Sequence, residues 1–449
     1  MTGGLFFGAL AALPAFGWGL VPRRASSWMP RPAGLAVAAG LGALAIGVEM
    51  LAMSALGIRW TAVRIAAGPL LLTALRLARR GRDAGLGWPR AGLLGSAALA
   101  ASLAVIAYAA FTTRATAADL LLFWGAKAER FAIAGGIDVA FLRDRNHWGV
   151  HSDYPPLLSC VWAFASLVAG RFAWGASLGT LPLFSGLLVL AAWGLARLEQ
   201  DERGAAASAA LLGALLCATL PIAATAGNAD PVLLFFEGTA LLLLVFARER
   251  PGATPIAGAL VAAAVLTKFE GGFFAAALVA ASLLTGRERR NRWREAAILA
   301  AFPAAALAGW LAFCRSRALF DFLGHAPRLY VDAGRLAVVV RGLAAGADYG
   351  AAWAPWIVAA ALLLLARPSR GLGLALGAAA FTAAADVLIY LTSPADPTMW
   401  VAWSASRLLL TPLTCLFVAA IASRGVGAGA RSRSRDDRTQ SAASAAPAG

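Results

Sequence analysis

The stretch AGLLGSAALAASLAVIAYAAFT, residues 91–112, holds no charged side chain over a length that can span a lipid bilayer. Similar apolar blocks recur along nearly the whole chain of 449 residues, of which 60% are hydrophobic and only 14% are charged. A water-soluble domain needs far more charge to cover its surface. Because a helix satisfies its own backbone hydrogen bonds in lipid, the sequence predicts an all-α polytopic integral membrane protein with about 12–14 transmembrane helices.

Clusters of arginine predict how these helices are oriented. The formal net charge is +16, and the arginines gather in short connections between apolar blocks and in the C-terminal tail. This distribution is typical of the positive-inside rule and of contact with anionic lipid, so we expect a bilayer as partner and no nucleic acid. The clusters at 23–31, 79–90 and 287–294 are then cytoplasmic, and 113–156 is the first large extracytoplasmic loop. We expect a multi-pass protein of the cell inner or plasma membrane.

Three segments are predicted along the chain. Residues 1–90 form an N-terminal three-helix extension, 91–424 form the main transmembrane module, and 425–449 form a basic, Ser- and Ala-rich cytoplasmic tail that is expected to be disordered. The segment 314–350 is predicted to be a short loop with no appended soluble domain.

Two parts of the topology stay open at this level. Between 154 and 193 an odd number of crossings is required although the length fits two helices, so one half is expected to be re-entrant or to lie at the interface. The two short apolar segments beside Lys268 form either two helices or one broken helix.

The outer loop is the one long region that mixes acids, bases, histidines and aromatic residues. It contains DLLLFWGAKA at 119–128 and HSDYPPL at 151–157. Aromatic rings among charges predict amphipathic helices at the membrane surface. His147, His151 and Asp153 would bind a metal only on a helix, and the Tyr-Pro-Pro run ends helical structure there. Polar contacts within a folded loop are the favoured interpretation, and we expect no cofactor; a divalent metal is possible but no ligand set supports it.

These two motifs and three later ones, in this order along the chain, resemble the motifs of a known family. The later strings are Gly227-Asn-Ala-Asp-Pro231, Leu266-Thr-Lys-Phe-Glu-Gly271 and Ser406-Arg-Leu-Leu-Leu410. Together they are similar to motifs of the GT-C superfamily of membrane glycosyltransferases, in the branch of protein O-mannosyltransferases and lipid A aminoarabinose transferases. The resemblance covers residues 91–423. It implies that a sugar moves, with inversion, from a polyprenyl-phosphate carrier to a hydroxyl of a glycan, lipid or protein acceptor of the cell envelope at the extracytoplasmic membrane face.

The resemblance implies that Asp119 is the general base. A hydroxyl is a poor nucleophile until a carboxylate withdraws its proton during attack. The alternative is that Asp119 only caps the helix that follows it.

The same resemblance and the chemistry of a phosphate leaving group select three cations. Lys268, Arg407 and Lys127 are expected to bind the donor phosphate, where negative charge develops. Alternatively, Lys268 pairs with Glu270, and Arg407 extends from its helix end to the lipid headgroups.

Further substrate-binding candidates share the predicted outer face. Asp230 is expected there together with Asp119, Lys268 and Asp396, although a helix cap is the favoured role for Asp230. The remaining candidates are His151, Asp153, Tyr154 and Glu270.

A different class of function stays possible. In a transporter or a flippase for lipid-linked sugars, buried charges and a broken helix near Lys268 would line a pathway. Against this, the two halves show no repeat in hydropathy, and the predicted charges gather at one face.

Overall fold

The computed structural model describes most of the chain as helices. The described residues are 1–78, 92–112, 118–144, 146, 150–224, 227–285, 289–319, 330, 333–349, 353–393 and 396–424. The expected disordered tail and the arginine cluster at 79–90 therefore lie outside the described residues. In chain order the elements are α1 (Thr2–Ala11), α2 (Leu13–Gly17), η1 (Trp18–Leu20), α3 (Arg23–Ser26), α4 (Arg31–Ala55), α5 (Ala62–Ala78), α6 (Gly92–Thr112), the π-helix η2 (Leu120–Trp124), α7 (Gly125–Ala134), α8 (Val139–Arg143), α9 (Leu157–Ala169), α10 (Trp174–Ser177), α11 (Thr180–Ala196), α12 (Glu202–Ala224), α13 (Asp230–Ala247), α14 (Ala253–Thr267), α15 (Glu270–Thr285), α16 (Arg289–Ser316), α17 (Ala333–Gly346), α18 (Ala354–Leu364), α19 (Arg370–Thr392), α20 (Pro397–Leu408) and α21 (Leu410–Ser423).

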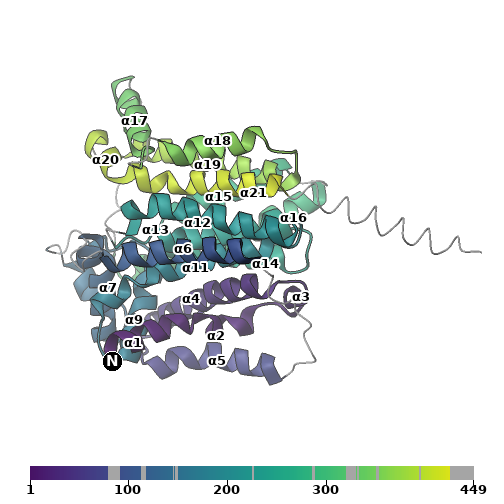
Figure 1. Ribbon diagram of the computed structural model, residues 1–449. Coiled ribbons are helices and arrows are strands. Elements are labelled where there is room, and N and C mark those ends of the chain that lie inside the picture. The colour runs from purple at the N-terminus through teal and green to yellow at the C-terminus, as the bar shows by residue number, and fades with distance from the viewer. Residues whose placement is uncertain are drawn as a thin grey trace, which may run out of the picture.

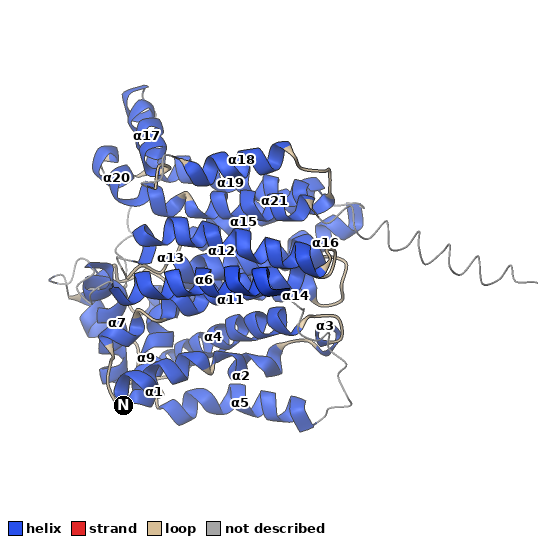
Figure 2. Ribbon diagram, viewed as in Figure 1, coloured by secondary structure: helices blue, strands red, loops and turns tan. Residues whose placement is uncertain are grey.

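The described part of the chain contains helices and no strand, as Figure 2 shows. Among the described residues, seven spans are long and apolar enough to cross a membrane, and four further apolar helices are shorter. The seven spans are Thr2–Leu20, Arg31–Ala55, Trp174–Ala196, Asp230–Ala247, Asn291–Ser316, Gly371–Thr392 and Pro397–Ser423. The protein is an all-α polytopic membrane protein, as predicted, while the total of 12–14 crossings stays a prediction.

The long helices lie side by side, and the connections gather at two ends of the bundle (Figure 1). One end holds α7, α20 and the N-terminus, and we call it the Asp119 end. The other end holds α3, where Trp28 donates from Nε1 to the Pro251 carbonyl at 3.1 Å. Gln200 likewise donates to the Ile421 carbonyl at 2.8 Å. The arginine-rich connections around these two contacts therefore share the second end, as the positive-inside pattern requires.

The open stretch between 154 and 193 contains the short apolar helix α9 and the helix α11, which is part of a candidate membrane span. Near the start of α9, Ser159 donates to the Trp124 carbonyl at 3.0 Å. Just beyond the end of α9, the Trp174 ring packs so closely on Gly125 that a Cβ there would be 2.7 Å from it. The start of α9 and the segment just beyond its end thus both lie beside η2 and α7 at the Asp119 end, and α11 belongs to the candidate span Trp174–Ala196. That one half of the stretch is re-entrant or interfacial stays a prediction, which this arrangement favours.

Two separate helices flank Lys268. The chain is extended at Lys268 (φ −150°, ψ 152°), and α14 and α15 pack against each other on either side of it. A side chain at Gly271 would overlap the Ala264 carbonyl, so only glycine permits this close reversal. The turn between two antiparallel helices places Lys268 at the Asp119 end.

One element of the late loop differs from the prediction. The segment 314–350 contains the helix α17, which packs against α20. The sequence did not predict α17, because this helix is too short and too charged to read as a membrane span, with Arg335 and Arg341 within it. Its mixed polar and apolar character is instead typical of a helix at a membrane surface. The absence of an appended soluble domain from 314–350 stays a prediction.

The N-terminal helices share the core with the rest of the bundle. The helix α4 packs against α2, α9, α11 and α14. One continuous buried cluster extends from Phe6 to Ala422. The helix α4 is therefore an integral part of the bundle. The division of the chain at residue 90 stays a prediction about evolutionary or functional units.

Labelling of single cysteines tests which end faces outward. In a variant without the native cysteines, Cys at the exposed positions Ala140 and Thr398 is expected to react with an impermeant thiol reagent on intact cells. Cys at Trp293, which is 60% exposed, or at Arg424 should react only after the membrane is permeabilised. Labelling of Trp293→Cys in intact cells would reverse the assignment of the two ends.

Candidate active site

Asp119 and Arg407 meet across the bundle. Arg407 lies in the last turn of α20, and its Nη1 is 2.9 Å from Asp119 Oδ2 and 2.6 Å from Asn228 Oδ1. Asp119 stands at the start of η2 but its side chain makes no capping hydrogen bond. The capping interpretation of Asp119 is therefore wrong, and Arg407 points to this carboxylate rather than only to headgroups.

Lys268 joins two other acids. Its Nζ is 2.8 Å from Asp230 Oδ1 and 3.1 Å from Glu270 Oε1. Tyr154 donates from its hydroxyl to Glu270 Oε2 at 2.7 Å. Asp230 makes no side-chain cap, so the favoured cap interpretation of this residue is also wrong. We call Asp119, Tyr154, Asn228, Asp230, Lys268, Glu270 and Arg407 the ion-pair network.

A glycine of the third motif permits this arrangement. Gly227 has φ +65°, which L side chains rarely adopt, and a Cβ there would be 2.5 Å from Leu120 Cβ. The turn that carries Asn228 therefore packs directly on the residue that follows Asp119. Asp119 itself precedes a π-helix, a local feature often found at functional sites.

Burial and neighbouring charge set the protonation of the network outside the membrane-spanning helices. Burial raises the pKa of Asp119 above its ordinary value, and the Arg407 guanidinium opposes this. Burial lowers the pKa of Lys268, but Asp230 and Glu270 outweigh it and raise that pKa, so the amine stays charged. Burial and then Glu270 raise the pKa of Tyr154, so its hydroxyl remains a neutral donor.

The other predicted residues form a neighbouring cluster. Lys127 is only 1% exposed, and its Nζ donates to the His151 carbonyl at 2.8 Å while lying 4.3 Å from the Phe123 ring centre. Asp153 is fully buried, and its carbonyl accepts from Trp310 Nε1 at 2.7 Å. These contacts hold the loop in place, and none of them joins Lys127, His151 or Asp153 to Asp119.

Sequence reasoning missed Asn228 as an Arg407 partner and missed a buried acid. Glu237 accepts from Thr411 at 2.7 Å inside the bundle. A small cavity of about 20 Å³ lies beside the network; its lining includes Asp230, Glu270, Asp386 and Arg407. Glu237 had a visible signal, since it is an acid within an apolar run, whereas an amide such as Asn228 has none.

Two further expectations concern metal and Asp396. Among the described residues, no three His, Cys, Asp or Glu side chains are grouped so as to hold a metal ion. Asp396 accepts from the Thr398 amide at 2.9 Å and caps α20, and among the described residues no hydrogen bond or ion pair joins it to the ion-pair network.

Comparison with protein families agrees with the motifs. Residues 153–313 match the family model described as dolichyl-phosphate-mannose-protein mannosyltransferase. Over this segment the chain resembles glycosyltransferases of the GT-C type. The predicted resemblance is confirmed at the level of the family, without a finer branch. Comparisons with curated proteins and with solved structures gave no significant match.

The matched family implies a membrane glycosyltransferase that uses a polyprenyl-phosphate sugar donor. The matched segment contains Tyr154, Asp230, Lys268 and Glu270 of the ion-pair network. Asp119 and Arg407 lie outside it, and the structure joins them to that segment through Asn228.

Proposed function

We propose that the protein transfers a sugar from a polyprenyl-phosphate donor to an acceptor hydroxyl at the extracytoplasmic membrane face, with Asp119 as general base. The observation that carries the proposal is the contact of the Asp119 carboxylate with Arg407 and, through Asn228, with the matched segment. A carboxylate at the end of a helical bundle that is half-buried and not used as a cap is available for proton transfer.

In the proposed reaction the acceptor oxygen forms a bond to the anomeric carbon as the bond from that carbon to the phosphate oxygen breaks. The acceptor proton passes to Asp119, and the polyprenyl phosphate leaves with the electron pair. Attack from the face opposite the phosphate inverts the anomeric centre. Burial makes Asp119 more basic than an exposed aspartate, which favours removal of a hydroxyl proton.

Lys268 and Arg407 can donate hydrogen bonds to the leaving phosphate while they keep their contacts with the carboxylates. An ammonium has three donors, and Lys268 uses two of them for Asp230 and Glu270. The two hydrogen bonds that the Arg407 side chain makes with other described residues both come from Nη1, which leaves Nε and Nη2 to donate to a phosphate oxygen. Lys127 lies beneath aromatic rings, and we assign it a weaker part in holding the donor.

Reconstitution in bilayers tests this proposal. Purified protein is supplied with labelled polyprenyl-phosphate mannose, then with other polyprenyl-phosphate sugars, and with cell-envelope material as acceptor. Transfer of label together with release of polyprenyl phosphate is the expected result. If no donor is consumed, the protein is not a transferase of this kind.

The pH profile of transfer tests the role of Asp119 through Arg407. A protonated carboxyl cannot accept a proton, so the rate should fall as the pH falls through the pKa of Asp119. Arg407 lowers that pKa against the effect of burial, so Arg407→Gln is expected to raise it and move the acid limb to higher pH. Arg130→Gln, which breaks a distant and half-exposed pair with Asp138, should leave the limb unchanged. An unmoved limb in Arg407→Gln would contradict the assignment, whatever happens to the maximal rate.

A further inference from the structure

One turn of the chain carries partners of both cations of the ion-pair network. Asn228 and Asp230 stand two residues apart where the chain enters α13. Asn228 Oδ1 accepts from Arg407 Nη1 at 2.6 Å. Asp230 Oδ1 accepts from Lys268 Nζ at 2.8 Å. The turn therefore sets the spacing between a guanidinium that comes from α20 and an ammonium that comes from the connection of α14 to α15.

The backbone of this turn has little freedom. Gly227 is in the left-handed region and packs directly on Leu120, as described above. The Ala229 carbonyl accepts from the Leu233 amide at 2.9 Å, in the first turn of α13. Asn228 lies between these two fixed points and is only 2% exposed. Its side-chain amide is thus held in one place by the backbone.

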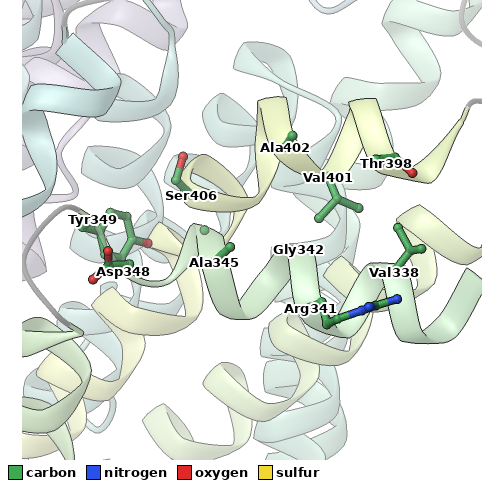
Figure 3. Close-up of a pocket in the computed structure, with 11 residues that line it drawn as sticks. Val338, Arg341, Gly342, Ala345, Asp348, Tyr349, Thr398, Val401, Ala402 and Ser406 are labelled. Atoms are coloured by element: carbon green, nitrogen blue, oxygen red, sulfur yellow. The ribbon is translucent and has the colours of Figure 1, made fainter.

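The backbone of α20 is fixed by α17, separately from the Arg407 side chain. A Cβ on Gly346 of α17 would be 2.6 Å from Ala405 Cβ and 2.9 Å from the Ser406 amide nitrogen, so the two helices are in close contact there. A cavity of about 670 Å³ lies between them, and Figure 3 shows Ser406 at its edge. Arg407 does not line this cavity. Packing against α17 therefore fixes the last turn of α20 but not the direction of the guanidinium.

Arg407 shares one nitrogen between a charged and a neutral oxygen. Its Nη1 is 2.9 Å from Asp119 Oδ2 and also donates to Asn228 Oδ1. An arginine that faces a carboxylate frequently makes two parallel hydrogen bonds with it. Such a pair would occupy both the proposed base and a second guanidinium nitrogen. Asn228 competes for Nη1 and, because it is uncharged, leaves the positive charge of Arg407 uncompensated for a phosphate.

We infer that Asn228 is a positioning residue for the proposed reaction: it holds Arg407 where the guanidinium is shared between Asp119 and the donor phosphate, and keeps it from closing on Asp119 as a two-bond pair. The inference rests on the proposed function, because it takes Asp119 as the base and Arg407 and Lys268 as phosphate ligands. Asn228 acts through Arg407 and is not itself assigned a contact with the substrate.

Binding of polyprenyl phosphate without a sugar is the first test, measured on the full chain in nanodiscs so that no transfer is needed. In Asn228→Ala the guanidinium can close on Asp119, and binding is expected to weaken by about 3- to 10-fold. Asn228→Asp keeps an oxygen in the same place, which preserves the contact with α20, but its charge compensates that of Arg407. It should weaken phosphate binding by a similar factor.

The pH profile of sugar transfer separates positioning from a loss of stability. Burial raises the pKa of Asp119, and the charged groups that modify it, Arg407, Asp230 and Lys268, lie on α20, α13 and the connection of α14 to α15. A two-bond pair in Asn228→Ala lowers this pKa, so the carboxylate stays ionised further into acid and the acid limb moves to lower pH by about half a unit. The added negative charge in Asn228→Asp raises the pKa and moves the limb to higher pH by about one unit.

A buried amide at the other end of the bundle is the matched control. Gln200 is 5% exposed, donates to the Ile421 carbonyl at 2.8 Å and accepts from the Ser208 hydroxyl at 2.8 Å. Gln200→Ala is expected to lower the thermal stability, because buried hydrogen bonds are lost. It should keep the polyprenyl phosphate binding and the acid limb of the wild type.

Each outcome decides the inference. Weaker phosphate binding in both Asn228 variants, with acid limbs that move in opposite directions, supports it. Unchanged binding in either variant, or limbs that stay in place or move in the same direction, overturns it, since a residue that only stabilises the turn does not shift the limb in a direction set by its charge. A wild-type protein that neither binds polyprenyl phosphate nor transfers sugar overturns the proposed function as well. If the wild type does both and the Asn228 variants match it, the inference fails and the proposed function stands.

Discussion

Replacement of Asp119 by Asn is expected to lower sugar transfer by roughly 10²-fold or more, the scale typical of losing a general base. Asn is close to Asp in size, and its Oδ1 can still accept from Arg407, so the contact between η2 and α20 can persist. It cannot take up a proton at neutral pH. The variant should therefore keep its thermal stability and donor binding while losing turnover.

A control on the same end of the bundle separates proton transfer from a general change of charge. Asp396→Asn also removes one negative charge, but Asp396 caps α20 and Asn is an equally good cap. Its transfer rate should stay near that of wild type. The measurement is initial transfer from purified donor lipid at matched protein levels, and near-normal turnover in Asp119→Asn would remove Asp119 from the mechanism.

The fold was predictable from the sequence wherever an uninterrupted apolar run decides the local structure. Uninterrupted apolar runs such as 91–112 predict helices in lipid regardless of their neighbours, because no other backbone structure except a closed barrel is stable there. The helix α17 has no such run, and its stability comes from packing on α20 through Gly342 and Gly346. That contact depends on a distant segment, so the local sequence did not predict it.

The candidate site was predictable in its members but less so in its pairings. Asp119, Lys268 and Arg407 were selected because isolated charges beside apolar runs are costly unless they are used or paired. Asp119 and Arg407 are separated by 288 positions, and nothing in either local sequence specifies the other. Arg407 was expected to serve only phosphate or headgroups, whereas the structure gives it two protein partners, Asp119 and Asn228.

These pairings change what the Lys268 variant should do. Lys268→Gln removes the partner of two buried or half-buried carboxylates, since the side chains of Lys268, Asp230 and Glu270 are 8%, 4% and 22% exposed. Breaking a buried pair by removing one member costs about 3–5 kcal/mol because a charge is left without compensation. We therefore expect Lys268→Gln to unfold at a markedly lower temperature or denaturant concentration in detergent, in addition to any loss of donor binding.

A second substitution tests whether the uncompensated charge is the cause. Asp230→Asn in the Lys268→Gln background removes the more deeply buried of the two carboxylates, so it is expected to recover much of the lost stability. Arg130→Gln is the matched control, because its pair with Asp138 has an arginine that is 49% exposed and should contribute at most about 1 kcal/mol. Unfolding midpoints of the four proteins give the comparison. If the double variant regains stability but not donor binding, Lys268 also serves the phosphate; if Lys268→Gln is as stable as wild type, the pair with Asp230 does not support the fold.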